Sequence, residues 1–319
     1  MNIVIFGASG MLGYDLVHHI KSLAGHNIGL ISTPSSGEVD LSDRVNVQHC
    51  LSTMKSRGFD TVINCAAVTD VNGIQSCIAD EQKSYYLNAL APKYIAEACN
   101  TLKMRLVHIS TDYVYSDMSL ETKMYHDEFP KNIYGYHKLI GELFIKSTMS
   151  SNYTIIRVGC LYGMNREKSF IHKFLKNVAN SIKNKDYSPS VVNYQCSTPT
   201  STEFVCDIII NLLENEMYGT FTASPSGHAN RFEFAEKIIE LMNKTGKFPD
   251  ELNSVTVKED YAELNYFIPP VSYMEGINQS SHIGYGYQWT WEDDLTRFID
   301  YYSESLSEWF SRIMRSDAR

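Results

Sequence analysis

The chain has 319 residues, of which 44% are hydrophobic and 20% charged, an ordinary composition for a globular protein. Its formal net charge is −9 and its basic residues are scattered, which argues against a nucleic-acid-binding surface. The seven cysteines form no C-x-x-C pair and the ten histidines have no metal-ligand spacing with them, so we expect reduced thiols and no metal. No run approaches the ~20 apolar residues that cross a bilayer, and no basic leader precedes the first apolar run. We therefore expect a cytoplasmic protein without a membrane partner.

Short apolar runs alternate with amphipathic helical patterns through the first half of the chain. The expected strands are Ile3–Phe6, Ile28–Ile31, Thr61–Cys65, Arg105–Ile109 and Thr154–Val158. The expected helices lie near 12–24, 43–56, 80–100 and 133–147. Strands that are hydrophobic throughout are typical of parallel sheets covered by helices on both faces. The pattern predicts an α/β fold with a Rossmann-type doubly wound parallel sheet.

The second half of the chain is less regular. One more strand is expected at Ser190–Val192, and helices are expected near 202–215 and 231–243. A last helix should begin after Thr290, because Thr290-x-x-Asp293 has the spacing of a capping box. We expect a dinucleotide-binding domain formed by residues 1–160 plus about 188–218. A smaller C-terminal substrate-binding lobe should comprise about 161–187 and 219–319.

A glycine-rich loop directly follows the first expected strand and opens a helix. Gly7 allows a tight turn, Gly10 lets the backbone approach a pyrophosphate, and Gly13 allows close packing of helix and strand. The helix N-terminus adds N–H groups and partial positive charge. This loop predicts a dinucleotide cofactor.

The end of the second expected strand bears on which cofactor binds. An acid at this place would hold the ribose of NAD, but the chain has Ser32 and Thr33 followed by Pro34-Ser35-Ser36. Hydroxyl groups here could bond a 2′-phosphate. We expect NADP (NADPH) to be preferred, with NAD possible.

Tyr134 and Lys138 are one helical turn apart on the same face of an expected helix. An ammonium group beside a phenol stabilises the phenolate and lowers its pKa from about 10. Such a pair can give a proton to a carbonyl oxygen while a hydride arrives at the carbon. Thr111 follows a buried strand, at the edge where ligands bind in open α/β sheets, and could hydrogen-bond the same oxygen.

Taken together, these residues resemble the extended short-chain dehydrogenase/reductase superfamily and, more closely, the dTDP-4-dehydrorhamnose reductase family. The segments that carry the resemblance span about residues 1–205 and are Gly7–Gly13, Asp40–Asp43, Asn64–Ala67, Thr69, Leu87–Ala89, Ser110–Tyr115, Tyr134–Glu142, Arg157, Gln195 and Pro199-Thr200. The resemblance implies an NAD(P)H-dependent reductase of a nucleotide-linked keto-sugar, a 4-keto-6-deoxy sugar, in surface polysaccharide or deoxysugar biosynthesis. It also suggests a homodimer.

The resemblance implies roles for individual positions. The catalytic set would be Thr111, Tyr134 and Lys138, with Tyr134 and Lys138 also contacting the cofactor. The other cofactor-binding positions, including the two hydroxyl residues after the second strand, would be Gly7, Gly10, Met11, Leu12, Ser32, Thr33, Asp40, Leu41, Ala66, Ala67 and Thr69. The substrate would contact Thr111, Asp112, Tyr113 and Cys160.

Three departures from the family pattern lie near the expected sugar pocket. Gly159-Cys160 stands where the family usually has Ser-Trp, Ser197 replaces a usual glycine, and Pro269–Tyr273 replaces an Arg-Pro…Asn-Ser pattern. These departures leave open which base and which sugar the substrate carries. Two alternatives stay open: an epimerase or dehydratase of the same superfamily, and a non-catalytic NADP-binding subunit similar to a regulatory subunit of methionine adenosyltransferase. Tyr113 argues against dehydration, because dehydratases have a glutamate there.

Overall fold

The computed structural model describes residues 1–22, 27–69, 78–115, 128–164, 169–184, 188–193, 195–260, 271–272 and 289–316. The end of the first expected helix, residues 23–24, and the Pro269-Pro270 pair lie outside these ranges. No helix among the described residues combines the length and the apolar character that crossing a membrane requires.

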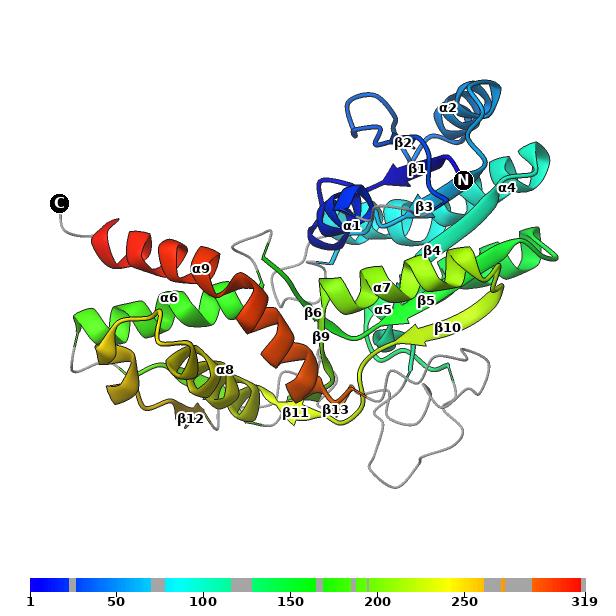
Figure 1. The fold of residues 1–319 in the computed structure, drawn as a ribbon. Coiled ribbons are helices and arrows are strands. Elements are labelled where there is room, and N and C mark those ends of the chain that lie inside the picture. Colours follow the sequence, from blue (N-terminus) through cyan, green and yellow to red (C-terminus); the bar gives the residue numbers. More distant parts are fainter. Residues whose placement is uncertain are drawn as a thin grey trace.

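A six-stranded parallel sheet organises the first part of the molecule (Figure 1). Its order is β10-β5-β4-β3-β1-β2, from Gly219–Ala223, Tyr153–Val158, Arg105–Thr111, Thr61–Asn64, Ile3–Phe6 and Ile31–Ser32. The chain passes from β1 to β2 on one side and returns to β3 on the other, so the strand order reverses between β1 and β3. In open α/β sheets, ligands bind at this reversal, beyond the carboxyl ends of the strands. The doubly wound parallel sheet is confirmed.

Helices cover both faces of the sheet and bury one apolar core on each. One face carries α1 (Met11–Ser22) and α7 (Thr202–Glu214), with a core that includes Leu16 and Ile209. The other face carries α2 (Arg44–Ser56), α4 (Ala91–Leu102) and α5 (Ile133–Thr148) over a core that includes Phe6 and Ile95. Most strand residues are fully buried, as continuous apolar strands require.

The expected helix near 80–100 is three consecutive segments. α3 (Ile78–Tyr85) runs into a π-helical turn, η1 (Tyr86–Leu90), and then into α4. Pro92 in the first turn of α4 has no N–H to donate to the preceding turn. The wider turn lets the Asn88 side chain donate to Val68 O at 2.8 Å and accept from Val68 N at 3.0 Å. A π-turn of this kind often marks a functional segment.

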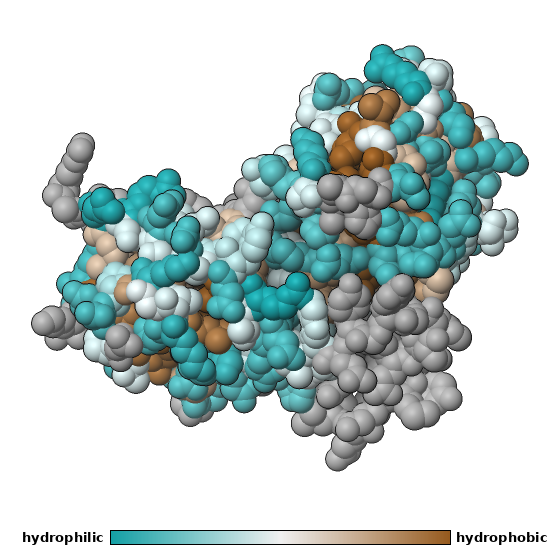
Figure 2. Space-filling model, viewed as in Figure 1, coloured by the Kyte–Doolittle hydropathy of each residue, from teal (hydrophilic) through white to brown (hydrophobic). Residues whose placement is uncertain are grey.

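The C-terminal lobe has a third core, built from α6 (Phe170–Lys183), α8 (Arg231–Thr245), η3 (Asp250–Ser254) and α9 (Trp291–Ser316). Small sheets join it to the rest of the chain: β6 (Cys160–Tyr162) pairs with β9 (Pro199–Ser201), and β8 (Cys196–Ser197) lies between β11 (Ala229–Asn230) and β13 (Val271–Ser272). On the face shown in Figure 2 the surface is mostly hydrophilic, with hydrophobic side chains gathered over the lobe and near the β2 edge of the sheet.

Three expectations differ from the structure. Gly219–Ala223, which we placed in the lobe, is the edge strand β10 and pairs with β5, whereas Ser190–Val192, which we placed with the main sheet, is β7 and pairs with β12 (Lys258–Asp260). Only long-range pairing decides where such short strands lie. The second strand begins at Ile31, and the N–H group of Leu30 donates to the Asn2 side chain instead of to a backbone carbonyl of β1.

The Thr290–Asp293 capping box is confirmed by reciprocal hydrogen bonds of 3.0 and 3.2 Å.

Candidate active site

The glycine loop has the geometry of a close-approach turn between β1 and α1. Gly7 has a φ angle of +76°, which residues other than glycine rarely adopt. A Cβ atom at this position would lie 2.5 Å from Ala66 N. A Cβ atom on Gly13 would overlap the carbonyl oxygen of Gly7. Gly10 N donates to Gly7 O at 2.8 Å and closes the turn. The loop therefore fits the phosphates of a dinucleotide, with Ala66 of the neighbouring strand end beside it.

Of the remaining expected cofactor positions, Met11 and Leu12 open α1 and Ser32 ends β2, and the others follow β2 and β3. Asp40 accepts from Ser42 N and Ser42 Oγ and fixes a turn, and the following Leu41 is buried. Ala66 N donates to Asn64 Oδ1, which shapes the segment that leads to Ala67 and Thr69. The structure brings these segments to one edge of the sheet, but their contacts with a cofactor stay predictions.

A cavity of about 550 Å³ lies between the end of β2 and α2. Ser32 and Thr33 line it, and so does Glu38. The Glu38 carboxylate accepts hydrogen bonds from Ser35 N and Ser35 Oγ, both at 2.7 Å, and these bonds lower its pKa. The acid absent from residues 32–36 is thus present six positions after Ser32. The loop after β2 folds back and brings Glu38 beside Ser32 and Thr33, which the order of residues along the chain does not show.

The expected catalytic hydroxyls meet at the end of β4. Thr111 is the last residue of β4, and its hydroxyl donates to Asp112 Oδ1 at 2.9 Å. The Thr111 hydroxyl also lies close enough to the phenol of Tyr134 to lower the pKa of that phenol. The Tyr113 ring meets the Tyr134 ring edge-on, with centroids 5.9 Å apart. The lowered pKa expected for Tyr134 is wrong for this structure: burial and the Asp112 carboxylate raise the pKa, so the residue carries its proton at neutral pH.

The first turn of α5 fixes the position of Tyr134. Asn132 caps the helix by accepting from Gly135 N at 2.8 Å. Gly135 lies against the Tyr113 carbonyl oxygen so closely that a Cβ atom would overlap it. Tyr134 is therefore held between the helix cap and the end of β4.

Lys138 is fully buried one turn further along α5. Its Nζ donates to Ile109 O at 2.5 Å and lies 3.2 Å from His108 Nε2. Burial lowers the pKa of Lys138 to about 8, while the Glu142 carboxylate opposes that change. Burial and the neighbouring Lys138 lower the pKa of His108 well below 6.5, so the imidazole is neutral.

His108 continues a hydrogen-bond chain that sequence analysis did not identify. Ala66 N donates to Asn64 Oδ1, which leaves the Asn64 amide hydrogens to face His108 Nδ1 at 3.2 Å. One ring nitrogen of His108 thus lies toward the Asn64 amide and the other toward Lys138 Nζ. Only the pairing of β3 with β4 brings Asn64 and His108 together.

Behind the catalytic residues, a buried ion pair fixes α5 against the sheet. Arg157 of β5 donates to Glu142 from Nε at 3.0 Å and from Nη2 at 2.6 Å. Ser110 Oγ donates to Glu142 Oε1 at 2.5 Å, and Arg157 Nη1 donates to Tyr115 Oη at 2.6 Å. Glu128 also pairs with Arg157. A bidentate pair of this kind specifies orientation as well as contact.

The expected substrate positions Asp112, Tyr113 and Cys160 lie near an unexpected residue, Arg231. Arg231 Nη1 donates to Cys160 Sγ at 2.7 Å, and its guanidinium lies 5.2 Å from the centre of the Phe170 ring. Burial lowers the pKa of Arg231, but Cys160, Tyr113 and Asp112 outweigh that effect and raise it. Cys160 and Arg231 are 71 residues apart in the chain, and no motif links them.

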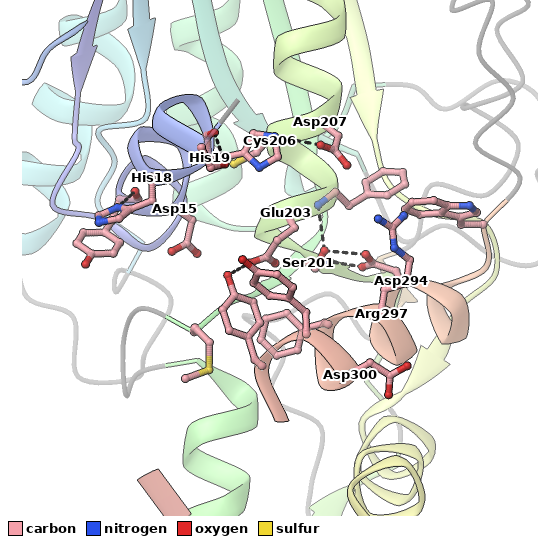
Figure 3. A pocket seen from close by; sticks show the side chains of 18 residues that line it. Asp15, His18, His19, Ser201, Glu203, Cys206, Asp207, Asp294, Arg297 and Asp300 are labelled. Atoms are coloured by element: carbon pink, nitrogen blue, oxygen red, sulfur yellow. Dashed lines mark hydrogen bonds and ion pairs between the residues drawn. The ribbon is translucent and has the colours of Figure 1, made fainter. Parts of the chain in front are cut away.

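A separate cavity of about 1070 Å³ lies between α1, α7 and α9 (Figure 3). None of its lining residues belongs to the Thr111–Tyr134–Lys138 set. The carboxyl groups that line it come from three helices and belong to Asp15, Glu203, Asp207, Asp294 and Asp300. Dashed lines in Figure 3 mark a hydrogen bond between Glu203 and a tyrosine of α9, which is Tyr302, and hydrogen bonds between Asp294 and Ser201. No group of side chains suited to hold a metal ion occurs among the described residues.

Comparisons with known proteins identify the family. The family model for the RmlD substrate binding domain matches residues 1–304. The chain belongs to this family. The chain is 29% identical to the spore coat polysaccharide biosynthesis protein SpsK of Bacillus subtilis over 75% of this chain and 78% of that protein.

Two solved structures show the same architecture. The dTDP-4-dehydrorhamnose reductase of Clostridium acetobutylicum is 27% identical and superimposes with a TM-score of 0.78, covering 95% of this chain and all of that one. The reductase of the same name from Bacillus anthracis, in complex with NADP, is 26% identical with a TM-score of 0.76, covering 94% of this chain and all of that one. The family that we recognised in the residues is confirmed.

Proposed function

We propose that this protein is an NAD(P)H-dependent reductase of a nucleotide-linked keto-sugar, with a 4-keto-6-deoxy sugar as the first substrate to test. The observation that carries the proposal is the placement of the Thr111 hydroxyl near the phenol of Tyr134, one helical turn from the buried Lys138. These residues lie at the end of β4, on the same edge of the sheet as the glycine loop. Relatives named dTDP-4-dehydrorhamnose reductase support the choice of substrate class.

The residues divide the reaction among them. The nicotinamide cofactor, when bound, supplies the hydride. The Thr111 hydroxyl bonds the carbonyl oxygen of the sugar, and Tyr134 gives its phenolic proton to that oxygen. The raised pKa of Tyr134 keeps the phenol protonated in the resting protein, and Lys138 stabilises the phenolate that remains after the proton is given up. The Ile109 carbonyl and His108 hold the Lys138 amine in place.

NADPH is the cofactor that we propose as preferred. The hydroxyl groups of Ser32 and Thr33 line the cavity beside β2, and a relative has been solved in complex with NADP. Glu38 in the same cavity is the feature that would oppose a 2′-phosphate, since both are anionic. Its carboxylate is held by Ser35. The ratio of kcat/KM for NADPH to that for NADH measures whether the hydroxyl groups of Ser32 and Thr33 or the carboxylate of Glu38 has the larger effect.

The test follows nicotinamide absorbance with NADPH, and then NADH, against nucleotide-linked 4-keto-6-deoxy sugars. We expect at least one to be reduced, and Tyr134→Phe to lower kcat by ~10²–10⁴ while cofactor affinity is kept. Tyr136→Phe is the matched control, because Tyr136 is 44% exposed on the same helix. Tight cofactor binding without oxidation of either cofactor contradicts a reductase and supports a binding subunit. Cofactor that stays bound through purification, with no net oxidation, supports an epimerase or dehydratase.

A further inference from the structure

The guanidinium of Arg231 differs from the other inward-facing arginines in what it bonds. Arg105 donates to the carbonyl oxygens of Leu212, Leu213 and Met217 at 2.8–2.9 Å. Arg157 is paired with two carboxylates. Arg231 donates to a thiol sulfur, Cys160 Sγ, and no ion pair involves it among the described residues. A guanidinium has five N–H donors and sulfur is a weak acceptor, so Arg231 has capacity for a stronger partner.

The position of Arg231 is fixed by backbone structure. It is the first residue of α8, whose N-cap Asn230 forms a complete capping box with Glu233 through two hydrogen bonds of 2.8 Å. Asn230 also pairs with β8, and Arg231 N donates to Gln195 O at 3.2 Å. The side chain lies over the ring of Phe170. An arginine that is already oriented loses little conformational entropy when it binds an anion.

The groups around Arg231 connect it to the proposed reaction centre. Tyr113 lies close enough to raise the pKa of Arg231, and the ring of Tyr113 contacts that of Tyr134. The nearby Asp112 carboxylate accepts from Thr111 and forms no ion pair with Arg231. Arg231 thus lies near Tyr113 and Asp112, two of the expected substrate positions, and Tyr113 in turn contacts Tyr134.

We propose that Arg231, held beside Cys160 and Tyr113, binds an anionic oxygen group of the substrate, so that the protein selects nucleotide-sugars by that group. The proposal rests on the proposed function for the identity of the pocket. Planar bidentate recognition by a guanidinium suits a carboxylate on the sugar ring and an oxygen pair of the diphosphate equally. These are two sources of one chemistry, and the experiment separates them.

The experiment measures binding by calorimetry, without turnover. Wild type, Arg231→Met and Arg231→Lys are titrated with UDP, UDP-glucose and UDP-glucuronic acid, and with dTDP and dTDP-glucose, in the presence of NADPH. Arg312→Met, an exposed position on α9, removes one positive charge elsewhere. We expect Arg231→Met to weaken the dissociation constant by about 10- to 100-fold for ligands that carry the recognised group, as for a charged hydrogen bond. Arg231→Lys should recover part of the loss.

The pattern across ligands identifies the source. A loss that includes free UDP or dTDP assigns Arg231 to the diphosphate. A loss confined to UDP-glucuronic acid, with a wild-type preference for it over UDP-glucose, assigns Arg231 to a sugar carboxylate. The proposal is overturned if Arg231→Met binds every ligand as Arg312→Met does, or if wild type binds none of them. Unchanged NADPH affinity and thermal melting show that the variant is folded. Arg231-dependent binding without sugar reduction contradicts the proposed function alone.

Discussion

The two faces of the central sheet treat their buried charges differently. On the α5 face, Glu142 is neutralised by Arg157, and both are almost completely buried. On the α1/α7 face, Asp15, Glu203 and Asp294 bond neutral donors, which are Thr202, Tyr302 and Ser201 respectively. Burial raises the pKa of all three carboxyl groups, because no opposite charge compensates fully for the loss of water. The first arrangement fixes geometry, and the second makes stability depend on pH.

The largest effect should come from breaking the ion pair on the α5 face. Glu142→Gln leaves Arg157 with Glu128 alone, and removal of one partner from a buried pair costs about 3–5 kcal/mol. Urea denaturation measures the loss of unfolding free energy. Glu128→Gln is the matched control, because its carboxylate is 35% exposed and exposed pairs contribute about 0–1 kcal/mol. Equal losses for the two variants would show that burial of Glu142 has no special cost.

The same glutamate should also affect the pH dependence of the reaction. The pKa of Lys138 is about 8, so its ammonium form is lost as pH rises through that value. We expect kcat/KM to fall about tenfold per pH unit above this point. Because Glu142 raises the pKa of Lys138, Glu142→Gln should move this limb to lower pH, and Glu128→Gln should leave it in place. An unshifted limb in a folded Glu142→Gln variant contradicts the electrostatic link.

On the α1/α7 face, the contribution of Glu203 to folding stability should change with pH in the opposite sense from that of an ion-paired carboxylate. Burial raises the pKa of Glu203 to about 7, above its unfolded value near 4.5. The folded state therefore binds this proton more tightly, and stability is lost as pH rises from about 4.5 to 7. Glu203→Gln should stabilise the protein by about 1–2 kcal/mol at pH 8 and have little effect at pH 4.5. Thermal melts of the wild type and the variant at the two pH values test this prediction. Equal changes in stability at both pH values would refute the link between the Glu203 pKa and stability.

The smallest effect concerns the cap that joins the two regions of the chain. Ser201 caps α7 by accepting from Phe204 N at 3.0 Å, and it donates to Asp294 Oδ1 at 2.7 Å. Ser201→Ala should cost about 1–2 kcal/mol, since it removes a cap and a bond to a buried carboxyl. Asn230→Ala removes a cap without such a bond and should cost about 1 kcal/mol. A Ser201→Ala cost no larger than that of Asn230→Ala would show that Asp294 is satisfied by Tyr162 and Ser201 N alone.

The sequence was most informative where function depends on neighbours along the chain. Gly7, Gly10 and Gly13 follow directly from the needs of a tight turn. Tyr134 and Lys138 share a helix face because of the helical repeat. The strands β1, β3, β4 and β5 were visible because each is buried on both faces and carries a run of apolar residues.

Tertiary structure alone decided the contacts between distant segments. His108 meets Lys138, Glu38 reaches the cavity beside Ser32, and Arg231 meets Cys160 only because strands, loops and lobe are assembled. The edge strand β10 and the lobe strand β7 are too short for periodicity to assign them to a sheet. The sequence by itself determined a glycine-rich loop and a Tyr–Lys pair, because both are local geometry. The surroundings that set the Lys138 pKa and place Arg231 beside Cys160 come from long-range packing, which no local spacing encodes.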